Sequence, residues 1–197
     1  NNVTTNSVTF DINETVPNAH SFRVELSTTV DFSSGISTQS VVAFGGASDF
    51  EQLTLGNLIG NTTYYGHIWA INHLGFWESA TYNSIPTFIT KPAPVSGFTA
   101  VTLAPVSEAE TKVKFGWGLG NNTAANTRFK VVLSSASDFS LNASTAIVGP
   151  SVFEVLFTTN NFQPLISNNT YYAKVEVLDA DLSRSQLSAS VTASTVT

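Results

Sequence analysis

The sequence predicts an all-β protein that consists of two tandem copies of one antiparallel β-sandwich. Three observations lead to this prediction. The composition favours strands over helices, several short segments alternate hydrophobic with polar residues, and one block of sequence recurs 107 positions further along the chain. The length of 197 residues suits two domains of about 100 residues each.

The composition is that of a strand-rich protein with few charges. Hydrophobic residues make up 42% of the chain and charged residues 11%, against about 25% charged residues in a typical soluble protein. Ser, Thr and Asn therefore supply most of the polar surface, and these residues favour turns or, for Thr, strands. Met is absent, and the helix formers Lys, Glu and Arg are scarce.

The charge and the absence of cysteine exclude several kinds of partner and site. A net charge of −6 with only 8 Lys and Arg leaves no basic patch for phosphate groups, which excludes nucleic acid as a partner. No segment has the roughly 18–20 consecutive apolar residues of a membrane helix. Without Cys the chain has no disulfide, zinc ribbon or thiol nucleophile. We therefore expect protein partners (neighbouring domains or identical subunits) or surface glycans, and no membrane insertion.

Hydrophobic residues recur with period two in three segments of the first copy, as in strands that turn one face to a core. The first segment begins at Val8, the second at Phe22 and the third at Tyr64. The predicted inward residues are Val8, Phe10, Ile12, Phe22, Val24, Leu26, Tyr64, Ile68 and Ala70.

The repeat appears in three blocks. Residues 22–33 match residues 129–140, including an Asp-Phe-Ser turn in each copy, and residues 58–65 match residues 165–172 at the same offset of 107. Residues 8–12 match residues 113–117 with the offset reduced by two, which places a small length difference in the loop that follows.

A proline-containing segment separates the two copies. Lys91-Pro92-Ala93-Pro94 favours an extended path, because proline has a fixed φ and no N–H to donate. We place the first domain at residues 1–91, the linker at 92–94 and the second domain at 95–197.

Residues 58–64 and the strand after them resemble the fibronectin type III domain, an immunoglobulin-like sandwich. In that family a tyrosine at this place bonds back to nearby backbone and pins the crossover between the sheets. Tyr64 and Tyr171 match this tyrosine corner, and Trp117 matches the tryptophan at the end of the family's second strand, where the first copy has Ile12. The resemblance implies two tandem fibronectin type III sandwiches. The Asp-Phe-Ser turns are similar to repeats of large bacterial or archaeal surface proteins.

The two copies differ at their first strand. In the second copy, residues 98–101 suit a strand about a dozen residues before Val113, but the first copy begins only seven residues before Val8. We therefore expect the first strand of domain 1 to be missing or severely shortened. Either the sequence is cut from a longer array, or the open edge accepts a strand from another molecule.

No residue pattern indicates catalysis. None of the three histidines, His20, His67 and His73, lies in a motif with a nucleophile and an orienting carboxylate. The glycine-rich segment 116–120 follows a strand but leads into no helix that would receive a phosphate. We predict no enzyme activity, no cofactor and no metal.

The outward row of the strand after Tyr64 is the best candidate for binding. In domain 1 this row is Tyr65, His67, Trp69 and Ile71. Two interpretations stay open: the row contacts a neighbouring subunit, domain or glycan, or Arg23 and nearby side chains cover it. The equivalent row of domain 2 suits an ordinary solvent face and comprises Tyr172, Lys174, Glu176 and Leu178.

Asn-x-Ser/Thr sequons are a second set of candidates, for glycosylation in a suitable secretory pathway. Their number is close to what chance gives in a chain so rich in Asn, Ser and Thr. The six acceptors are Asn2, Asn13, Asn61, Asn121, Asn142 and Asn168.

The sequence therefore predicts a non-catalytic, extracellular structural, spacer or adhesion module of a secreted or cell-surface protein. The alternatives are a subunit of an extracellular filament assembled by strand donation and an accessory polysaccharide-binding module. Because domain 1 has both the open edge and the aromatic row, we expect any function beyond spacing to lie there.

Overall fold

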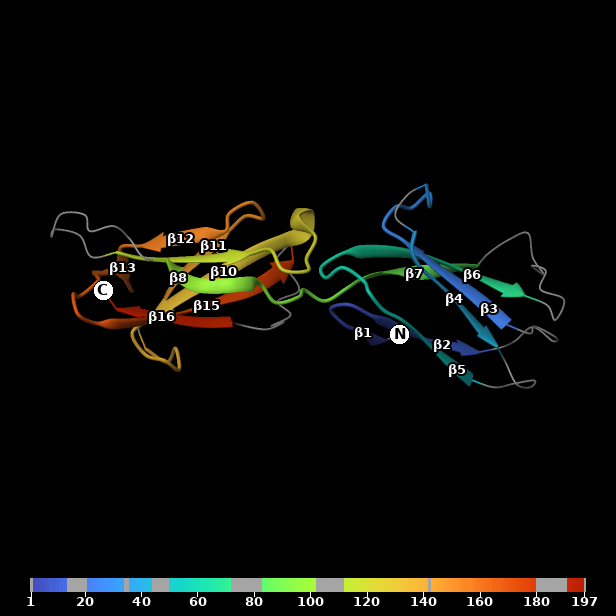
Figure 1. Cartoon of the computed structure of the whole chain (residues 1–197), viewed down its shortest axis with the longest axis horizontal. Coiled ribbons are helices and arrows are strands. Elements are labelled where there is room, and N and C mark those ends of the chain that lie inside the picture. The colour runs from blue at the N-terminus through green and yellow to red at the C-terminus, as the bar shows by residue number, and fades with distance from the viewer. Residues whose placement is uncertain are drawn as a thin grey trace. The chain divides into compact units, whose positions relative to one another are not determined.

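The structure is a computed structural model, and it describes residues 2–13, 21–33, 36–43, 50–71, 83–101, 112–141, 143–179 and 191–196. The chain divides into two compact units, Asn1–Lys91 and Pro92–Thr197, called domains 1 and 2 below (Figure 1). The described parts of both are built from antiparallel strands, and their one helical element is the 3₁₀ turn Ala124–Asn126.

The described part of domain 1 has two sheets. The smaller has the order β1-β2-β5 and the larger the order β4-β3-β6-β7. The bounds are β1 Asn2–Val3, β2 Val8–Asn13, β3 Ser21–Ser27, β4 Ile36–Ala43, β5 Phe50–Leu55, β6 Thr63–Ile71 and β7 Asn83–Ile89.

Domain 2 repeats this arrangement with the orders β12-β9-β8 and β11-β10-β15-β16, and it adds a short hairpin, β13-β14. The bounds are β8 Ser96–Val101, β9 Val113–Gly118, β10 Thr127–Ser134, β11 Ser144–Val148, β12 Glu154–Phe157, β13 Thr159–Asn160, β14 Gln163–Pro164, β15 Thr170–Asp179 and β16 Val191–Val196.

Alternate residues of the longer strands fill the core between the two sheets, as period two requires. In β3 the buried hydrophobic side chains are Phe22, Val24 and Leu26, and their partners in the core of domain 1 include Phe10 and Ile12. Ile68, predicted to point inward, is half-buried against this cluster.

The core of domain 2 is built around Trp117, which occupies the place that Ile12 has in domain 1. Trp117 is 6% exposed, and its ring contacts the rings of Phe98 and Phe129. Its indole nitrogen is buried without a hydrogen-bond partner in the described structure. The second core is therefore more aromatic than the first at this position.

The first strands of the two domains differ in length. Strand β1 has two residues and pairs with β2 only at Val3↔Val8 and Asn2↔Thr9. Its counterpart β8 has six residues. Among the described residues, the part of β2 from Phe10 onward has strand β5 as its single partner.

The proline segment is held at both ends. The N–H of Lys91 donates to the carbonyl of Thr4 in domain 1. Ala93 is buried in domain 2, where its N–H donates to Asn122 Oδ1 at 2.7 Å and its carbonyl accepts from Asn122 Nδ2 at 2.9 Å. Residues expected to form a linker thus pack on domain 2, and Pro92 alone lies between the two bonded residues.

The uniform offset of 107 conceals two length changes that nearly cancel. Val42 pairs with Phe22 as Val148 pairs with Phe129, and Leu55 pairs with Val8 as Phe157 pairs with Val113. Thirteen positions separate Val42 from Leu55, but nine separate Val148 from Phe157.

The second change follows immediately. The buried Leu58 lies three positions after Leu55, whereas its counterpart Leu165 lies eight positions after Phe157. Domain 2 is therefore four residues shorter before this point and five residues longer after it. The extra residues form the hairpin β13-β14.

Candidate functional site

Both tyrosines that match the family's corner bond to backbone five residues upstream. The N–H of Ile59 donates to Tyr64 Oη at 2.9 Å, and the N–H of Ile166 donates to Tyr171 Oη at 2.9 Å. The two rings are 0% and 2% exposed. A buried hydroxyl that satisfies a backbone N–H fixes the crossover into the next strand, which is a structural role.

Each domain has an Asp-Phe-Ser turn after its central strand β3 or β10. Asp31 accepts hydrogen bonds from the N–H of Ser33 at 3.1 Å and from its hydroxyl at 2.7 Å. Asp138 accepts the same pair from Ser140 at 3.0 and 2.6 Å. These bonds, with the hydroxyl bond the largest cause, hold the pKa of both exposed carboxyls below 3.8.

The phenylalanine of each turn has a left-handed backbone, with φ of 53° at Phe32 and 59° at Phe139. This conformation is costly for a bulky residue. It places the ring against the outer row of the neighbouring strand. The ring of Phe32 stacks on that of His67 with centroids 3.6 Å apart and planes 16° apart. In domain 2, the ring centroid of Phe139 lies 5.1 Å from Lys174 Nζ.

In the outer row of β6 in domain 1, His67 and Trp69 are in contact with neighbouring side chains of the same domain. His67 meets Trp69 edge to face at 5.6 Å, and Arg23 lies with its guanidinium carbon 5.8 Å from the Trp69 ring centroid. Arg23 also forms an ion pair with Glu25. Burial lowers the pKa of His67 below 6.5, although the carboxylate of Glu25 opposes this shift.

The structure therefore shows local cover over His67 and Trp69 by Phe32 and Arg23. Tyr65 is half-buried in the same row, and the side chain of Ile71 lies outside the described residues. A partner on this row, whether protein or glycan, stays a prediction.

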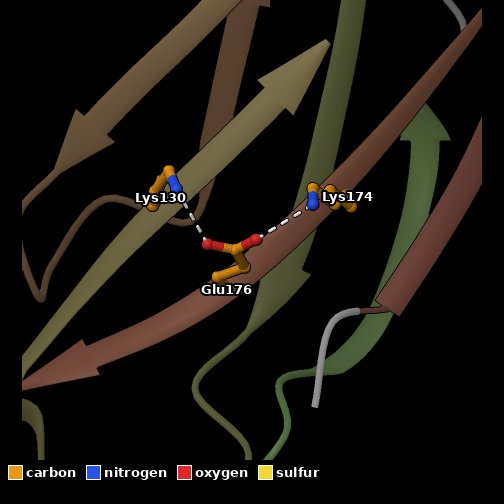
Figure 2. A network of polar contacts seen from close by, with 3 residues as sticks. All are labelled: Lys130, Lys174 and Glu176. Atoms are coloured by element: carbon orange, nitrogen blue, oxygen red, sulfur yellow. Dashed lines mark hydrogen bonds and ion pairs between the residues drawn. The ribbon is translucent and has the colours of Figure 1, made fainter. Parts of the chain in front are cut away.

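The outer row of β15 in domain 2 carries an ion network instead (Figure 2). Glu176 is only 4% exposed, and its two carboxylate oxygens lie 3.0 Å from Lys130 Nζ and 3.1 Å from Lys174 Nζ. Burial alone would raise the pKa of Glu176, but hydrogen bonds from both lysines hold it below 4.5. This face is less exposed at its centre than the sequence suggests.

The sequons occupy different environments. Asn2, Asn121 and Asn168 are exposed, whereas Asn61 is 1% exposed, so a glycan on Asn61 is incompatible with this fold. The side chain of Asn13 and all of Asn142 lie outside the described residues.

The sequence reasoning missed a second surface, on domain 2, where β11, β12 and the hairpin meet. A hollow of about 390 Å³ lies between these elements, and Phe162 on its rim is 93% exposed. A signal for it exists in the sequence, since the run of residues 139–173 contains a single charged residue, Glu154.

The described residues contain no group of three or more His, Asp or Glu side chains placed to hold a metal ion. No helix within the described ranges is long and apolar enough to cross a membrane.

Comparison with known proteins identifies the fold. A two-domain fibronectin type III segment of chicken tenascin matches 100% of this chain and 95% of its own length, with a TM-score of 0.58 and 12% sequence identity. The chain has the fold of two tandem fibronectin type III domains. This confirms the predicted all-β class and the two immunoglobulin-like sandwiches.

The other comparisons give little further information about this chain. The first to third fibronectin type III domains of chicken CNTN1 match 98% of this chain and 62% of their own length, with a TM-score of 0.43 and 12% identity. Neither a family model nor a curated protein matches the sequence. At 12% identity the likeness establishes the fold alone.

Proposed function

We propose that this chain is a non-catalytic structural or adhesion module of an extracellular or cell-surface protein. The observation that carries the proposal is the pair of fibronectin type III sandwiches, each fixed by its own tyrosine corner. A fold of this kind serves many roles, so the proposal rests on the surface as well as on the fold.

The joint between the domains supports a spacing role. Lys91 is bonded to domain 1 and Ala93 to domain 2, so a single residue connects the bonded ends of the two folded units. The side chains of the outer rows are engaged with one another, which suits a structural surface better than a reaction centre.

The composition supports an extracellular location, and the proposal of a bacterial or archaeal surface protein rests on the Asp-Phe-Ser turns alone. The chain has few charges and no thiol to be oxidised outside the cell. The Asp-Phe-Ser turns, similar to those of large bacterial surface proteins, occur in both domains with the same hydrogen bonds.

Labelling of intact source cells tests the location. An antibody raised against the folded chain should bind intact cells or detect the protein in the medium, and external protease should remove the cell-bound signal. A cytoplasmic protein of known location provides the control for lysis. Labelling that appears only after the cells are opened contradicts the proposal.

Single-molecule stretching of the full chain tests the spacing role. We expect two separate unfolding events, each releasing about 30–35 nm of chain, because the units Asn1–Lys91 and Pro92–Thr197 extend by up to about 3.6 Å per residue, less the length of the folded domain. One event that releases twice this length contradicts independent modules.

A filament subunit assembled by strand donation is the second candidate. Strand β1 pairs with Val8 and Thr9 of β2, and this candidate requires a strand of another molecule to pair along that edge. Electron microscopy of the purified chain at high concentration should then show ordered filaments. Their absence across buffers that keep the chain folded contradicts this candidate.

A further inference from the structure

The inserted hairpin β13-β14 of domain 2 holds an aromatic side chain in solvent. Asn161 has φ of 49° and Phe162 has φ of 63°. Two successive left-handed residues between short paired strands are typical of a type I′ turn, whose favoured sequence is Asn-Gly. Phenylalanine is therefore strained at the second position, and its side chain is 93% exposed. The packing of domain 2 itself gains little from this residue.

The hairpin is held in place beside strand β11. The N–H of Asn161 donates to Ser144 Oγ at 2.7 Å, and Ser144 is the first residue of β11. Phe162 is thus presented on a supported turn.

A hollow lies next to Phe162 on the same surface. It has a volume of about 390 Å³ and separates β11 from β12. Ala146, Val155 and Phe157 line it, and all three also contact the core of domain 2. The hollow therefore offers apolar contacts to a side chain that enters it from outside.

The strands on both sides of the hollow are the outermost strands of their sheets in the described structure. Strand β11 carries no charge and no proline, the features that commonly keep an edge from pairing with another chain. Ile147 on β11 and Leu156 on β12 are 53% and 48% exposed. This edge is open to strand pairing.

The charge pattern indicates which partner suits this surface. Among residues 139–173 the single charged side chain is Glu154, which is paired with Lys114 at 2.7 Å. The whole chain has a net charge of −6, so two copies repel each other over most of their surfaces. They meet no such repulsion here, whereas a basic or acidic partner finds no charge to recognise.

We propose that two copies of this chain associate through this surface, defined as β11, β12 and the hairpin β13-β14. An antiparallel strand edge is complementary to itself across a two-fold axis, so β11 of one copy pairs with β11 of the other. Phe162 of each copy then enters the hollow of its partner. The self-association does not depend on where the protein is located or on its spacing role.

Sedimentation of the full chain between about 1 and 500 μM tests the proposal. The wild type should pass from monomer to dimer in this range. Phe162→Gly creates the favoured Asn-Gly turn, so it should weaken association at least about 10-fold, as truncation of a central interface residue does. Since it also relieves the left-handed strain, its midpoint of thermal unfolding should rise by about 3 °C.

Two further variants complete the experiment. Val30→Ser alters a side chain of domain 1 that is 72% exposed, and it should leave the dimer unchanged. Ile147→Lys places a charge on the edge strand and should also weaken association at least about 10-fold. Circular dichroism of each variant checks that the chain is folded.

Three results would overturn the proposal. The first is a wild type that stays monomeric up to about 500 μM, and the second is a Phe162→Gly variant that associates as strongly as the wild type. The third is dissociation caused equally by Val30→Ser. Labelling of intact cells remains informative in each case, so failure of this proposal and failure of the proposed location are distinguishable.

Discussion

The outer rows of β6 and β15 occupy equivalent places in the two domains, yet they are covered in different ways. In domain 1 the ring of Phe32 stacks on His67, and Arg23 lies over Trp69. In domain 2 the positions of Arg23, His67 and Trp69 carry Lys130, Lys174 and Glu176, which form an ion network (Figure 2). Stacked rings in one domain thus correspond to charges in the other.

This difference shows which features of the repeat are constrained. The inward residues, the tyrosine corner and the Asp-Phe-Ser turn are shared by the two domains, because each one either packs in the core or forms a hydrogen bond with a backbone group. The outer row has only to be compatible with its cross-strand neighbours. It can therefore change from aromatic to charged as long as the neighbouring residues change with it.

The domains also differ in where large hydrophobic side chains are exposed. Among the described residues, three such side chains lie in domain 1, and eight lie in domain 2. The aromatic row of domain 1 drew attention to that domain in the sequence, but Phe32 and Arg23 lie against its His67 and Trp69. The hairpin of domain 2 is where an uncovered aromatic residue lies.

The largest expected change in stability concerns an inward position that is equivalent in β6 and β15, where domain 1 has Gly66 and domain 2 has Ala173. A Cβ on Gly66 would lie 2.9 Å from Ile85 Cβ and 3.2 Å from Leu26 Cδ2, so Gly66→Ala should destabilise domain 1 by about 2 kcal/mol through overpacking. Ala173 is 0% exposed, so Ala173→Gly should destabilise domain 2 by about 1–2 kcal/mol.

Urea unfolding of the full chain, followed through the indole N–H signals of Trp69 and Trp117, measures each domain separately. In each variant the unaltered domain is the control. If Gly66→Ala stabilises domain 1, the two cores are more alike at this position than the structure indicates.

The tyrosine corners should behave alike. Tyr64→Phe and Tyr171→Phe each remove the acceptor of a backbone N–H, which costs about 1–2 kcal/mol. The same urea experiment should show equal losses, the first in domain 1 and the second in domain 2. A loss in one domain alone would mean that only one corner is needed to hold the crossover.

The ion network should stabilise domain 2 in a pH-dependent way. Because the folded pKa of Glu176 is below 4.5, its contribution is complete above pH 4.5 and is lost as the pH falls through the lower folded pKa. Glu176→Gln should cost domain 2 about 1 kcal/mol at neutral pH and reduce its acid sensitivity. Domain 1 in the same sample is the control, and an unchanged acid midpoint for domain 2 would contradict this role.

The smallest effect concerns His67. Its folded pKa is lowered, so domain 1 should be fully stabilised above pH 6.5 and should lose stability as the pH falls below that value. The loss should be less than about 0.5 kcal/mol, and His67→Phe, which keeps a ring against Phe32, should remove it. NMR titration of the His67 ring should give a pKa below 6.5, and a value above 6.5 would contradict its burial.

The sequence by itself determined the tandem sandwich and the inward rows. Period-two alternation assigns Phe22, Val24 and Leu26 to the core without knowledge of their partners, because successive side chains of a strand point to opposite faces. The matched blocks around Tyr64 and Tyr171 likewise locate the corners, since each hydrogen bond spans only five residues.

Only the tertiary structure decided which outer side chains are covered and which are not. Asn122 bonds Ala93 across 29 residues, and Lys130 meets Glu176 across 46, so neither contact follows from a local pattern. The alignment of the two copies does not reveal the hairpin with Phe162. The connection between Val148 and Phe157 is shorter than its counterpart in domain 1, and this almost cancels the extra length of the hairpin. Strand pairing between distant residues reveals both changes, because register is set by hydrogen bonds across the sheet and not by position along the chain.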